Sequence, residues 1–580
     1  MSSGRRCWPL SFVLVLLAWH RFSHELGTTF APPPRESLKG LWDDWWDQTL
    51  PAGEDLSNIG TNDILRSFKR TLDEDMFQEI EMDGVPKSSA SIGGGDNFFE
   101  KQMEVFKENG PAVVSNFGPL KTLSISDPAM VKHALSEKGN FGKGILALVA
   151  EDIFGKALIT ASDPDLWRTR RAATSAGFHS QWLRSLTEDF VNCTAQAMRL
   201  LDERAKYKEV VDMESFYLNL ALDAVGLTIF GVNFEASNQP PDQPQAPIVQ
   251  AVYRLLKETD YRQADPTNLL LMGAPDLLAE VAAPRVAEYR RSMKKINEVL
   301  NEAIGNALDE QFLMDEEDLR RRSGGTLLQF IVDLRGNQAS RAQLQDDMRT
   351  VLIAGHETVA STLTWATYEL AKNPRIVQKA KQEVQEVLGG RTPTYQDVKD
   401  LKYLRRVLTE TLRMYPAPPF LARSPLKDLE LPSGTNQTVR LSRGSLLMIQ
   451  LAQLHRHPGI YERPTEFWPE RWEKAFNGTG DYPVPGWKGY DPQRVTGLYP
   501  TEVATDYAFV GFGGGEFKCI GDQFAMLEAT VMLSMLLQRY DFQMVYEDLS
   551  SIGLDMAATI HTKHGLLTRV SVAEATKAKM

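Results

Sequence analysis

The longest helical pattern in the chain runs from about Ser340 to Asn373-Pro374. Gln343 follows Ser340 at the spacing of a capping box, and the proline cannot continue the helix. At 1.5 Å per residue the helix would be about 50 Å long, enough to cross a whole domain. The pattern therefore predicts one long central helix.

Elsewhere the spacing of apolar residues predicts mostly helices, with a few short strands. Helices are expected at residues 98–109, 128–135, 374–388 and 401–414, with long amphipathic helices between about 180 and 313. Strands are expected at residues 112–114, 122–125, 438–441, 445–449 and 558–572. Residues 473–504 are rich in Gly, Pro and Tyr and are expected to form a surface insertion. The pattern predicts a mainly α protein with a minor β sheet (α+β), in a single large domain over residues 97–575.

The first residues are patterned as a targeting leader. Two arginines precede an apolar run from Leu10 to Trp19, which is shorter than the roughly 20 residues needed to span a bilayer. A cleaved signal peptide therefore fits residues 1–34 better than a permanent anchor does. The segment Thr28–Arg35 resembles the two-part leaders of algae whose plastids lie inside extra membranes. A simple secretory signal and an endoplasmic reticulum membrane anchor are the alternatives, and residues 35–96 are expected to be leader remainder and lead-in.

Charge and cysteine content narrow the classes of function. The net charge of −12 is spread along the 580-residue chain, which argues against nucleic-acid binding. Apolar residues make up 43% of the chain, enough for a sizeable core. Cys7, Cys193 and Cys519 fit neither a disulfide framework nor a zinc-ligand spacing, so a reducing compartment is expected.

One cysteine lies in a glycine-rich loop. Residues 512–521 are FGGGEFKCIG, and an apolar helical pattern follows. Glycines such as Gly513 let backbone N–H groups turn inward, and Gly521 would let a flat ligand lie near the backbone. Cys519 precedes the helix, where first-turn N–H groups favour the thiolate over the thiol. A thiolate that ligates a metal is one interpretation; for a lone cysteine, burial behind a turn is the commoner one.

The predicted central helix carries Gly355, Glu357 and Thr358 in its apolar middle. An isolated buried charge is costly, so the Glu–Thr pair needs a reason. The glycine leaves a gap beside the helix, and the threonine hydroxyl can bond backward to a carbonyl and loosen the backbone. Together they could hold water and deliver protons to a bound reactant. A glycine kept for packing is the alternative.

Two further patterns combine charge with aromatic or acidic partners. Glu410 and Arg413 share one helix face at i and i+3, and Arg471 could join them, because an arginine fork matches a carboxylate. Trp167 and Arg171 place an indole and a guanidinium a turn apart. Taken alone, both patterns also fit solvated helix faces.

Taken together, these motifs and the spacing Phe-x-x-Gly-x-x-x-Cys-x-Gly resemble the haem-thiolate site of a cytochrome P450. The resemblance covers roughly residues 97–572. Within the family, the chain is most similar to the plastid carotenoid β/ε-ring hydroxylases. The segments that carry it are Phe141–Leu146, Leu352–Thr358, Leu401–Leu404, Glu410–Pro416, Cys519–Phe524 and Thr559–Thr562. It implies the cytochrome P450 fold and a haem, iron protoporphyrin IX, with an axial cysteine thiolate.

The resemblance also implies a reaction and partners. A hydrophobic substrate, by this likeness the end ring of a carotenoid, would be hydroxylated with O₂ and two electrons from ferredoxin or a P450 reductase. Such a substrate makes peripheral membrane contact an expectation. Fatty-acid hydroxylases of the family share the Ala-Gly-His-Glu-Thr pattern, so fatty-acid or other isoprenoid hydroxylation is the alternative.

Roles for single residues follow from the same resemblance. Cys519 would be the iron ligand, in a loop shaped by Phe512, Gly513 and Gly521. The haem propionates would be bound by Trp167, Arg171, Arg423 and His455. Protons would be relayed by Glu357 and Thr358. The underside of the cysteine loop would be locked by Glu410, Arg413 and Arg471.

Phe517 departs from the family pattern, in which Arg or His usually stands two residues before the cysteine. The change removes one expected propionate partner and leaves that role to Trp167, Arg171 and Arg423. Two other functions fit parts of the pattern. An O₂-independent isomerase or dehydratase needs no proton relay, so the intact Glu357–Thr358 pair argues against it. A non-catalytic haem protein is favoured by Phe517 alone.

Overall fold

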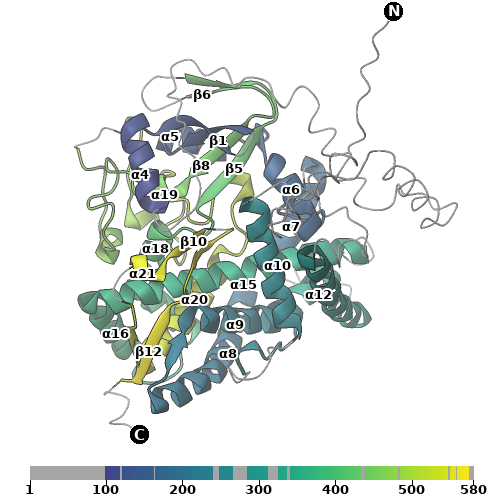
Figure 1. Ribbon diagram of the computed structural model, residues 1–580, viewed down its shortest axis with the longest axis vertical. Helices are drawn as coiled ribbons and strands as arrows, with labels where there is room; N and C mark the ends of the chain where they lie inside the picture. The colour runs from purple at the N-terminus through teal and green to yellow at the C-terminus, as the bar shows by residue number, and fades with distance from the viewer. Residues whose placement is uncertain are drawn as a thin grey trace, which may run out of the picture.

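The computed structural model describes residues 98–573, except residues 118–119, 162, 239–246, 265–283, 311–323, 336–339, 433–437, 481–483, 547–548 and 557. The predicted leader and lead-in, residues 1–96, lie outside the described residues. Within the described part, helices predominate and gather around one long helix, and strands lie on both sides of it (Figure 1).

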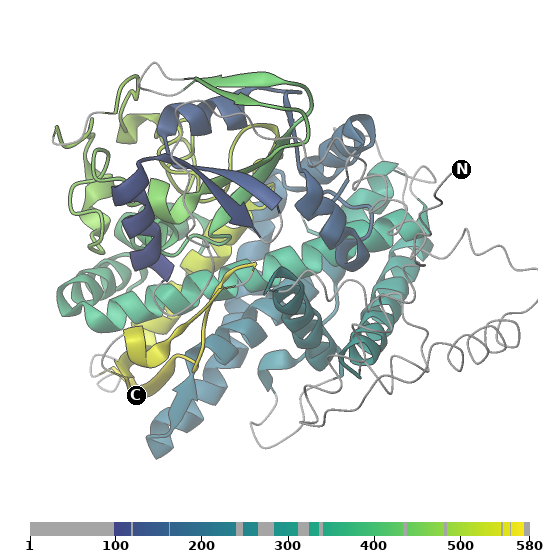
Figure 2. The same ribbon diagram turned by 45° about the horizontal axis from the view of Figure 1, so that its top comes forward.

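Helix α15 (Arg341–Lys372) is that long helix, and it crosses the middle of the molecule in both views (Figure 1, Figure 2). The Ser340 side chain caps it by accepting a hydrogen bond from the Gln343 N–H at 3.2 Å, and the helix ends before Pro374, as predicted. Most of its residues from Leu344 to Leu370 are buried, because other elements cover it on nearly every side.

The remaining helices include several that were predicted and some that were not. The bounds are α4 (Phe98–Asn109), α5 (Pro128–Ser136), α6 (Ile145–Phe154), α7 (Pro164–Gly177), α8 (Ser180–Tyr207), α9 (Met213–Val225), α10 (Pro247–Ala264), α12 (Pro284–Asp309), α14 (Leu327–Arg335), α16 (Pro374–Leu388), α17 (Tyr395–Asp400), α18 (Lys402–Met414), α19 (Leu451–Leu454), α20 (Asp522–Arg539) and α21 (Leu549–Ile552). Among the described residues, no helix combines the length and hydropathy that a membrane span requires.

The strands form one larger sheet and several small ones. The bounds are β1 (Ala112–Phe117), β2 (Leu120–Ile125), β3 (Phe141–Gly142), β4 (Val210–Asp212), β5 (Phe420–Pro425), β6 (Leu429–Pro432), β7 (Thr438–Leu441), β8 (Leu446–Gln450), β9 (Tyr540–Met544), β10 (Leu554–Met556), β11 (Ile560–Thr562) and β12 (Leu567–Val572). The larger sheet has the order β1-β2-β8-β5-β3, in which β2 and β8 run parallel and the other pairs antiparallel. The smaller sheets are β4-β12-β9, β6-β7 and β10-β11.

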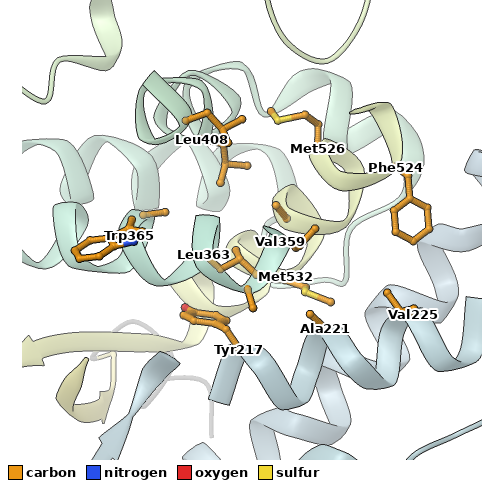
Figure 3. Packing of buried hydrophobic residues seen from close by; sticks show 14 of the residues in the cluster. Tyr217, Ala221, Val225, Val359, Leu363, Trp365, Leu408, Phe524, Met526 and Met532 are labelled. Carbon is orange, nitrogen blue, oxygen red and sulfur yellow. The ribbon is translucent and has the colours of Figure 1, made fainter. Parts of the chain in front are cut away.

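The core lies where α9, α15, α18 and α20 meet. Figure 3 shows the buried side chains that fill it, among them Tyr217, Val225, Val359, Leu363, Trp365, Leu408, Phe524 and Met532. The Trp365 ring stacks on Tyr415 with centroids 4.4 Å apart, and its N–H donates to the Ile560 carbonyl at 2.8 Å. The core thus also holds β11 against α15.

The prediction that residues 473–504 form a surface insertion holds only in part: the described residues from 473 to 488 are exposed or half-buried, but the later residues pack on the core. Tyr490, Leu498 and Tyr499 are buried, and Phe476 and Tyr490 pair in a short β-bridge. The Tyr490 ring packs edge to face on Trp472 at 5.4 Å. Glycine and proline set the turns of this segment, while its aromatic residues cover the core. The predicted fold class, mainly α with a minor sheet around a long central helix, is confirmed.

Candidate active site

The cysteine loop begins at Phe512 and leads into α20. The Cys519 N–H donates to the Phe512 carbonyl at 2.9 Å, which closes the loop on itself. Gly513 and Gly515 have φ angles of 72° and 66°, left-handed values that glycine accepts readily. A side chain at Gly515 would meet the Leu135 carbonyl oxygen at 1.6 Å, so only glycine fits against α5 there. The loop leaves Cys519 exposed.

The thiol of Cys519 is accessible, yet it lies deep among protein atoms. Gly521 is the N-cap of α20, and a side chain there would lie 3.9 Å from the Cys519 sulfur. Burial raises the pKa of the Cys519 thiol to about 11, with Asp522 adding to the rise, while the Gly521 N–H and Arg171 offset only part of it. The Gly521 N–H therefore acts on the thiol pKa in the direction expected of a helix start, although burial outweighs it. A metal bonded to the sulfur would supply the missing stabilisation, because a coordinating thiol is deprotonated.

Three basic side chains gather beside this loop: Lys143, Arg171 and Arg423. The Lys143 Nζ lies 5.6 Å from the centre of the Trp167 ring and 5.4 Å from that of Phe517. The Arg423 guanidinium lies 5.1 Å from the Phe517 ring centre, and the two aromatic rings meet edge to face at 4.7 Å. Burial lowers the pKa of Arg423 to about 10. The residue that departs from the family pattern therefore sits among cations.

Trp167 and Arg171 are one turn apart on α7, whose N-cap is Asp163. The Trp167 indole N–H donates to the Leu158 carbonyl at 3.2 Å. The indole hydrogen already has an acceptor, so in this structure Trp167 offers the site its ring rather than a hydrogen bond. Burial lowers the pKa of Arg171, although the charges of Cys519 and Asp522 act to raise it.

Thr358 lies on the one face of α15 that is not fully covered. Ala354 is exposed and Gly355 and Thr358 are half-buried, whereas Ile353, Glu357 and Val359 are buried. The Thr358 hydroxyl donates to the Ala354 carbonyl at 2.8 Å, the backward bond considered from the sequence. A side chain at Gly355 would meet Val225 of α9 at 3.1 Å. The gap left by this glycine is thus taken up by close packing of α9.

The Glu357 carboxylate is held by the last strands of the chain. The Thr559 hydroxyl donates to Glu357 Oε1 at 2.8 Å, and His561 Nε2 lies 3.1 Å from the same oxygen. His561 Nδ1 lies 2.9 Å from Glu214 Oε1 in the first turn of α9. Burial opposes protonation of His561, but the two carboxylates raise its pKa to about 10. Burial likewise opposes ionisation of Glu357, but His561 and Thr559 hold the pKa of that carboxyl below its usual value.

This arrangement places the His561 ring between two carboxyl groups, and it joins α15, α9 and β11. Sequence reasoning missed Glu214, Thr559 and His561 as site residues. The segment Thr559–Thr562 entered only as part of the family resemblance. The useful signal was a Thr-x-His-Thr pattern in a segment predicted to be a strand.

Glu410, Arg413 and Arg471 lie together. The Glu410 carboxylate accepts hydrogen bonds from both guanidinium groups, with N–O distances of 2.8–2.9 Å. It also accepts from the Trp468 N–H and the Trp472 indole N–H, each at 2.9 Å. Arg413 is fully buried, so this network satisfies charges that water does not reach.

His455 does not join the three cations. Its ring is fully buried and stacks on Phe509 with centroids 5.1 Å apart, and its Nε2 accepts from the Val510 N–H at 3.1 Å. Its backbone carbonyl accepts from Arg413 at 2.7 Å. The predicted propionate role of His455 is therefore not supported, because the ring is enclosed behind the cysteine loop. It links that loop to the Glu410 network instead.

The residues that remain fit a flat anionic group that carries a metal. Cys519 supplies an accessible sulfur beside a glycine loop. The Lys143 Nζ is buried without a hydrogen-bond partner among the described residues, and two arginines stand near it. A buried cation calls for an anion, and haem combines an iron atom with two propionate carboxylates. Fold and site together define a haem-thiolate protein.

The model of the family "Cytochrome P450" matches residues 88–567, and the chain belongs to this family. It is 36% identical to "Cytochrome P450 97B2, chloroplastic" of Glycine max, over 82% of this chain and 83% of the relative. It is 32% identical to "Carotene epsilon-monooxygenase, chloroplastic" of Arabidopsis thaliana, over 88% and 89%. It is 33% identical to "Protein LUTEIN DEFICIENT 5, chloroplastic" of the same plant, over 85% and 77%.

Family membership confirms several expectations. The protein is a cytochrome P450 monooxygenase with a haem-thiolate cofactor. It uses O₂, electrons from a redox partner and a hydrophobic substrate.

Proposed function

We propose that this cytochrome P450 hydroxylates the end ring of a carotenoid inside a plastid. The observation that carries the proposal is the 32% identity to a protein named carotene epsilon-monooxygenase, over 88% of this chain and 89% of that one. The other two relatives described above also carry the word chloroplastic in their names. The leader pattern of residues 1–34 agrees with a plastid of the type that lies inside extra membranes.

A bound haem would supply the activation of O₂, with electron density from its axial thiolate. We assign that thiolate to Cys519, in the loop closed by the Cys519–Phe512 hydrogen bond and shaped by Gly513 and Gly521. Arg171 and Arg423 would neutralise the propionates, and the Trp167 ring would pack beside them. The Glu410 network would hold the loop from below through His455 and Val510.

Proton supply would fall to Thr358 and Glu357. The Thr358 hydroxyl donates its hydrogen to the Ala354 carbonyl, which leaves its oxygen lone pairs free to accept a hydrogen bond. From there it can accept a hydrogen bond from water and hold that water beside the substrate space. The carboxyl group of Glu357, the preceding residue, is held by His561, which gives the relay an acid–base group with a defined position.

The electron donor follows from the compartment. In a plastid, ferredoxin would supply the electrons; a P450 reductase would do so if the leader were an endoplasmic reticulum anchor. We further propose peripheral membrane contact, which suits a carotenoid dissolved in lipid, through the segment before β1 and the helices between residues 214 and 290. A fusion of residues 1–96 to a fluorescent protein, expressed in an alga with a complex plastid, tests the compartment. Fluorescence in the endoplasmic reticulum alone would contradict it.

Product analysis tests the substrate. The protein is produced in bacteria that accumulate β-carotene or α-carotene, together with ferredoxin and its reductase, and pigments are separated by chromatography. Cells that produce the parent protein are expected to contain hydroxylated carotenes. Cells that produce the Cys519→Ser variant are expected to contain none. Recovery of both carotenes unchanged, from cells that contain haem-loaded and reducible enzyme, would contradict the proposal. The motif Ala354–Thr358 is shared with fatty-acid hydroxylases, so a parallel incubation with a medium-chain fatty acid tests the second candidate.

A further inference from the structure

We propose that the ammonium of Lys143 binds a haem propionate and takes the place of the cation that Phe517 replaces. The proposal rests on the haem cofactor of the family and not on the carotenoid substrate. No sequence motif singled out Lys143, which lies in the short segment between β3 and α6. Its role follows from what the fold brings around it.

Sheet register places Lys143 beside Arg423. Strand β3 pairs antiparallel with β5, with Phe141 opposite Pro425 and Gly142 opposite Ser424. The next position along β3 is Lys143, and the preceding one along β5 is Arg423. Gly144 holds the turn in place, since it has a φ of 71° and a side chain there would meet Ser424 at 2.9 Å. The pairing of Phe141 and Gly142 thus brings the backbone of Lys143, the residue after β3, close to that of Arg423.

The Phe517 ring lies close to both cations and adds no charge. Lys143 Nζ and the Arg423 guanidinium lie 5.4 and 5.1 Å from its centre. Both contacts fall within the range of cation–π attraction, which orients a cation without neutralising it. An arginine in place of Phe517 would add another positive charge to Lys143, Arg171 and Arg423. Because phenylalanine avoids this added repulsion, Lys143 can serve as the hydrogen-bond donor to the propionate at this place.

The Lys143 ammonium has no hydrogen-bonded carboxylate in the part of the chain that the structure describes. Its Nζ is buried and has no hydrogen-bond partner among the described residues. The charges that act on it, those of Arg423 and Arg171, are both positive, and with burial they lower its pKa to about 7. A buried ammonium in such surroundings either loses its proton or gains an anion. A propionate carboxylate would accept its N–H hydrogens and restore the charge.

The first test measures haem retention rather than turnover. Purified holoproteins are mixed with excess apomyoglobin, and the rate of haem transfer is followed in the visible spectrum. Lys143→Met is expected to lose haem about tenfold faster than the parent, as for the loss of one hydrogen bond between charged groups. Lys138→Met serves as control, because Lys138 is an exposed lysine five residues away, and its rate should match the parent.

The second test moves the charge back to the usual position. Phe517→Arg added to Lys143→Met is expected to restore slow haem loss, whereas Phe517→Arg alone should gain little because it adds a like charge. The haem reduction potential should fall in Lys143→Met and recover in the double variant, since a nearby positive charge favours the ferrous state.

Two results would overturn the proposal. One is a folded Lys143→Met holoprotein with parental haem loss and potential. The other is equally fast haem loss from three proteins: Lys143→Met, the double variant and Phe517→Leu alone. That result would assign the faster haem loss to disturbed packing of the Phe517 ring.

Discussion

The Oε1 atom of Glu357 and the Nε2 atom of His561 lie 3.1 Å apart, which joins the middle of the central helix to the last hairpin of the chain. His561 reaches Glu214 with its other ring nitrogen, at 2.9 Å. The acid proposed for proton supply is thus positioned by a strand near the C-terminus and by the first turn of α9. We infer that His561 is a positioning residue for Glu357.

Replacing His561 by Gln should uncouple O₂ consumption from product formation. Glutamine keeps one hydrogen bond but removes the positive charge, so Glu357 is free to turn and to gain a proton. The amount of product per O₂ consumed should fall severalfold, with kcat affected more than KM. His564→Gln, an exposed histidine of the same hairpin, is the control. Parental coupling in a stable His561→Gln enzyme would contradict the positioning role.

The same contact predicts how stability depends on pH. The carboxylates of Glu214 and Glu357 raise the pKa of His561 to about 10 in the folded protein, above its ordinary value. The stability it contributes is complete below about pH 6.5 and is lost as the pH rises toward 10. Over that window the melting temperature of the parent should fall more steeply than that of His561→Gln, because one proton is released on unfolding. Parallel curves would show that His561 is not charged in the folded state.

Thr358→Ala should raise the share of reducing equivalents that end as hydrogen peroxide. The variant removes the hydroxyl that faces the open side of α15, while the helix keeps its backbone hydrogen bonds. Thr364→Ala is a matched control, since the Thr364 hydroxyl donates to the Ala360 carbonyl at the same 2.8 Å but is fully buried. Peroxide and product are measured against NADPH consumed. An unchanged ratio in Thr358→Ala would remove Thr358 from the relay.

Glu410→Gln should destabilise the protein strongly. The substitution leaves the buried Arg413 and Arg471 without their shared carboxylate, and breaking such a pair costs about 3–5 kcal/mol. Glu473→Gln is the control, because Glu473 is half-exposed and meets Arg406 at the surface, where a pair contributes about 0–1 kcal/mol. The measurement is thermal unfolding of both variants. Equal losses of stability would contradict a central role for the Glu410 network.

Local signals explain the parts of the fold that could be predicted. The start of α15 is set by the Ser340 cap and its end by Pro374, and both act within a few residues. Strand β4 was not predicted, because its three residues become a strand only through pairing with β12, where Asp212 lies opposite Leu567. The extent of the leader and the ends of the domain at residues 97 and 575 stay predictions.

For the site, too, residues within one short segment could be predicted, whereas residues brought together from distant segments could not. The cysteine loop and the Trp167–Arg171 pair could be found from spacing, because each lies within one short segment. Lys143 could not, since its neighbours Trp167, Arg423 and Phe517 come from three distant segments. His455 was misplaced for the same reason: its sequence neighbourhood does not reveal that its ring turns toward Phe509.

The carbon monoxide spectrum of the reduced holoprotein tests the central claim, that Cys519 is the axial thiolate of a bound haem. The parent protein should show a Soret band at about 450 nm, the position produced by a thiolate ligand, and Cys519→Ser should lose it. A parent protein that is folded and haem-loaded but absorbs only at about 420 nm would contradict the account, because its haem would then lack a thiolate.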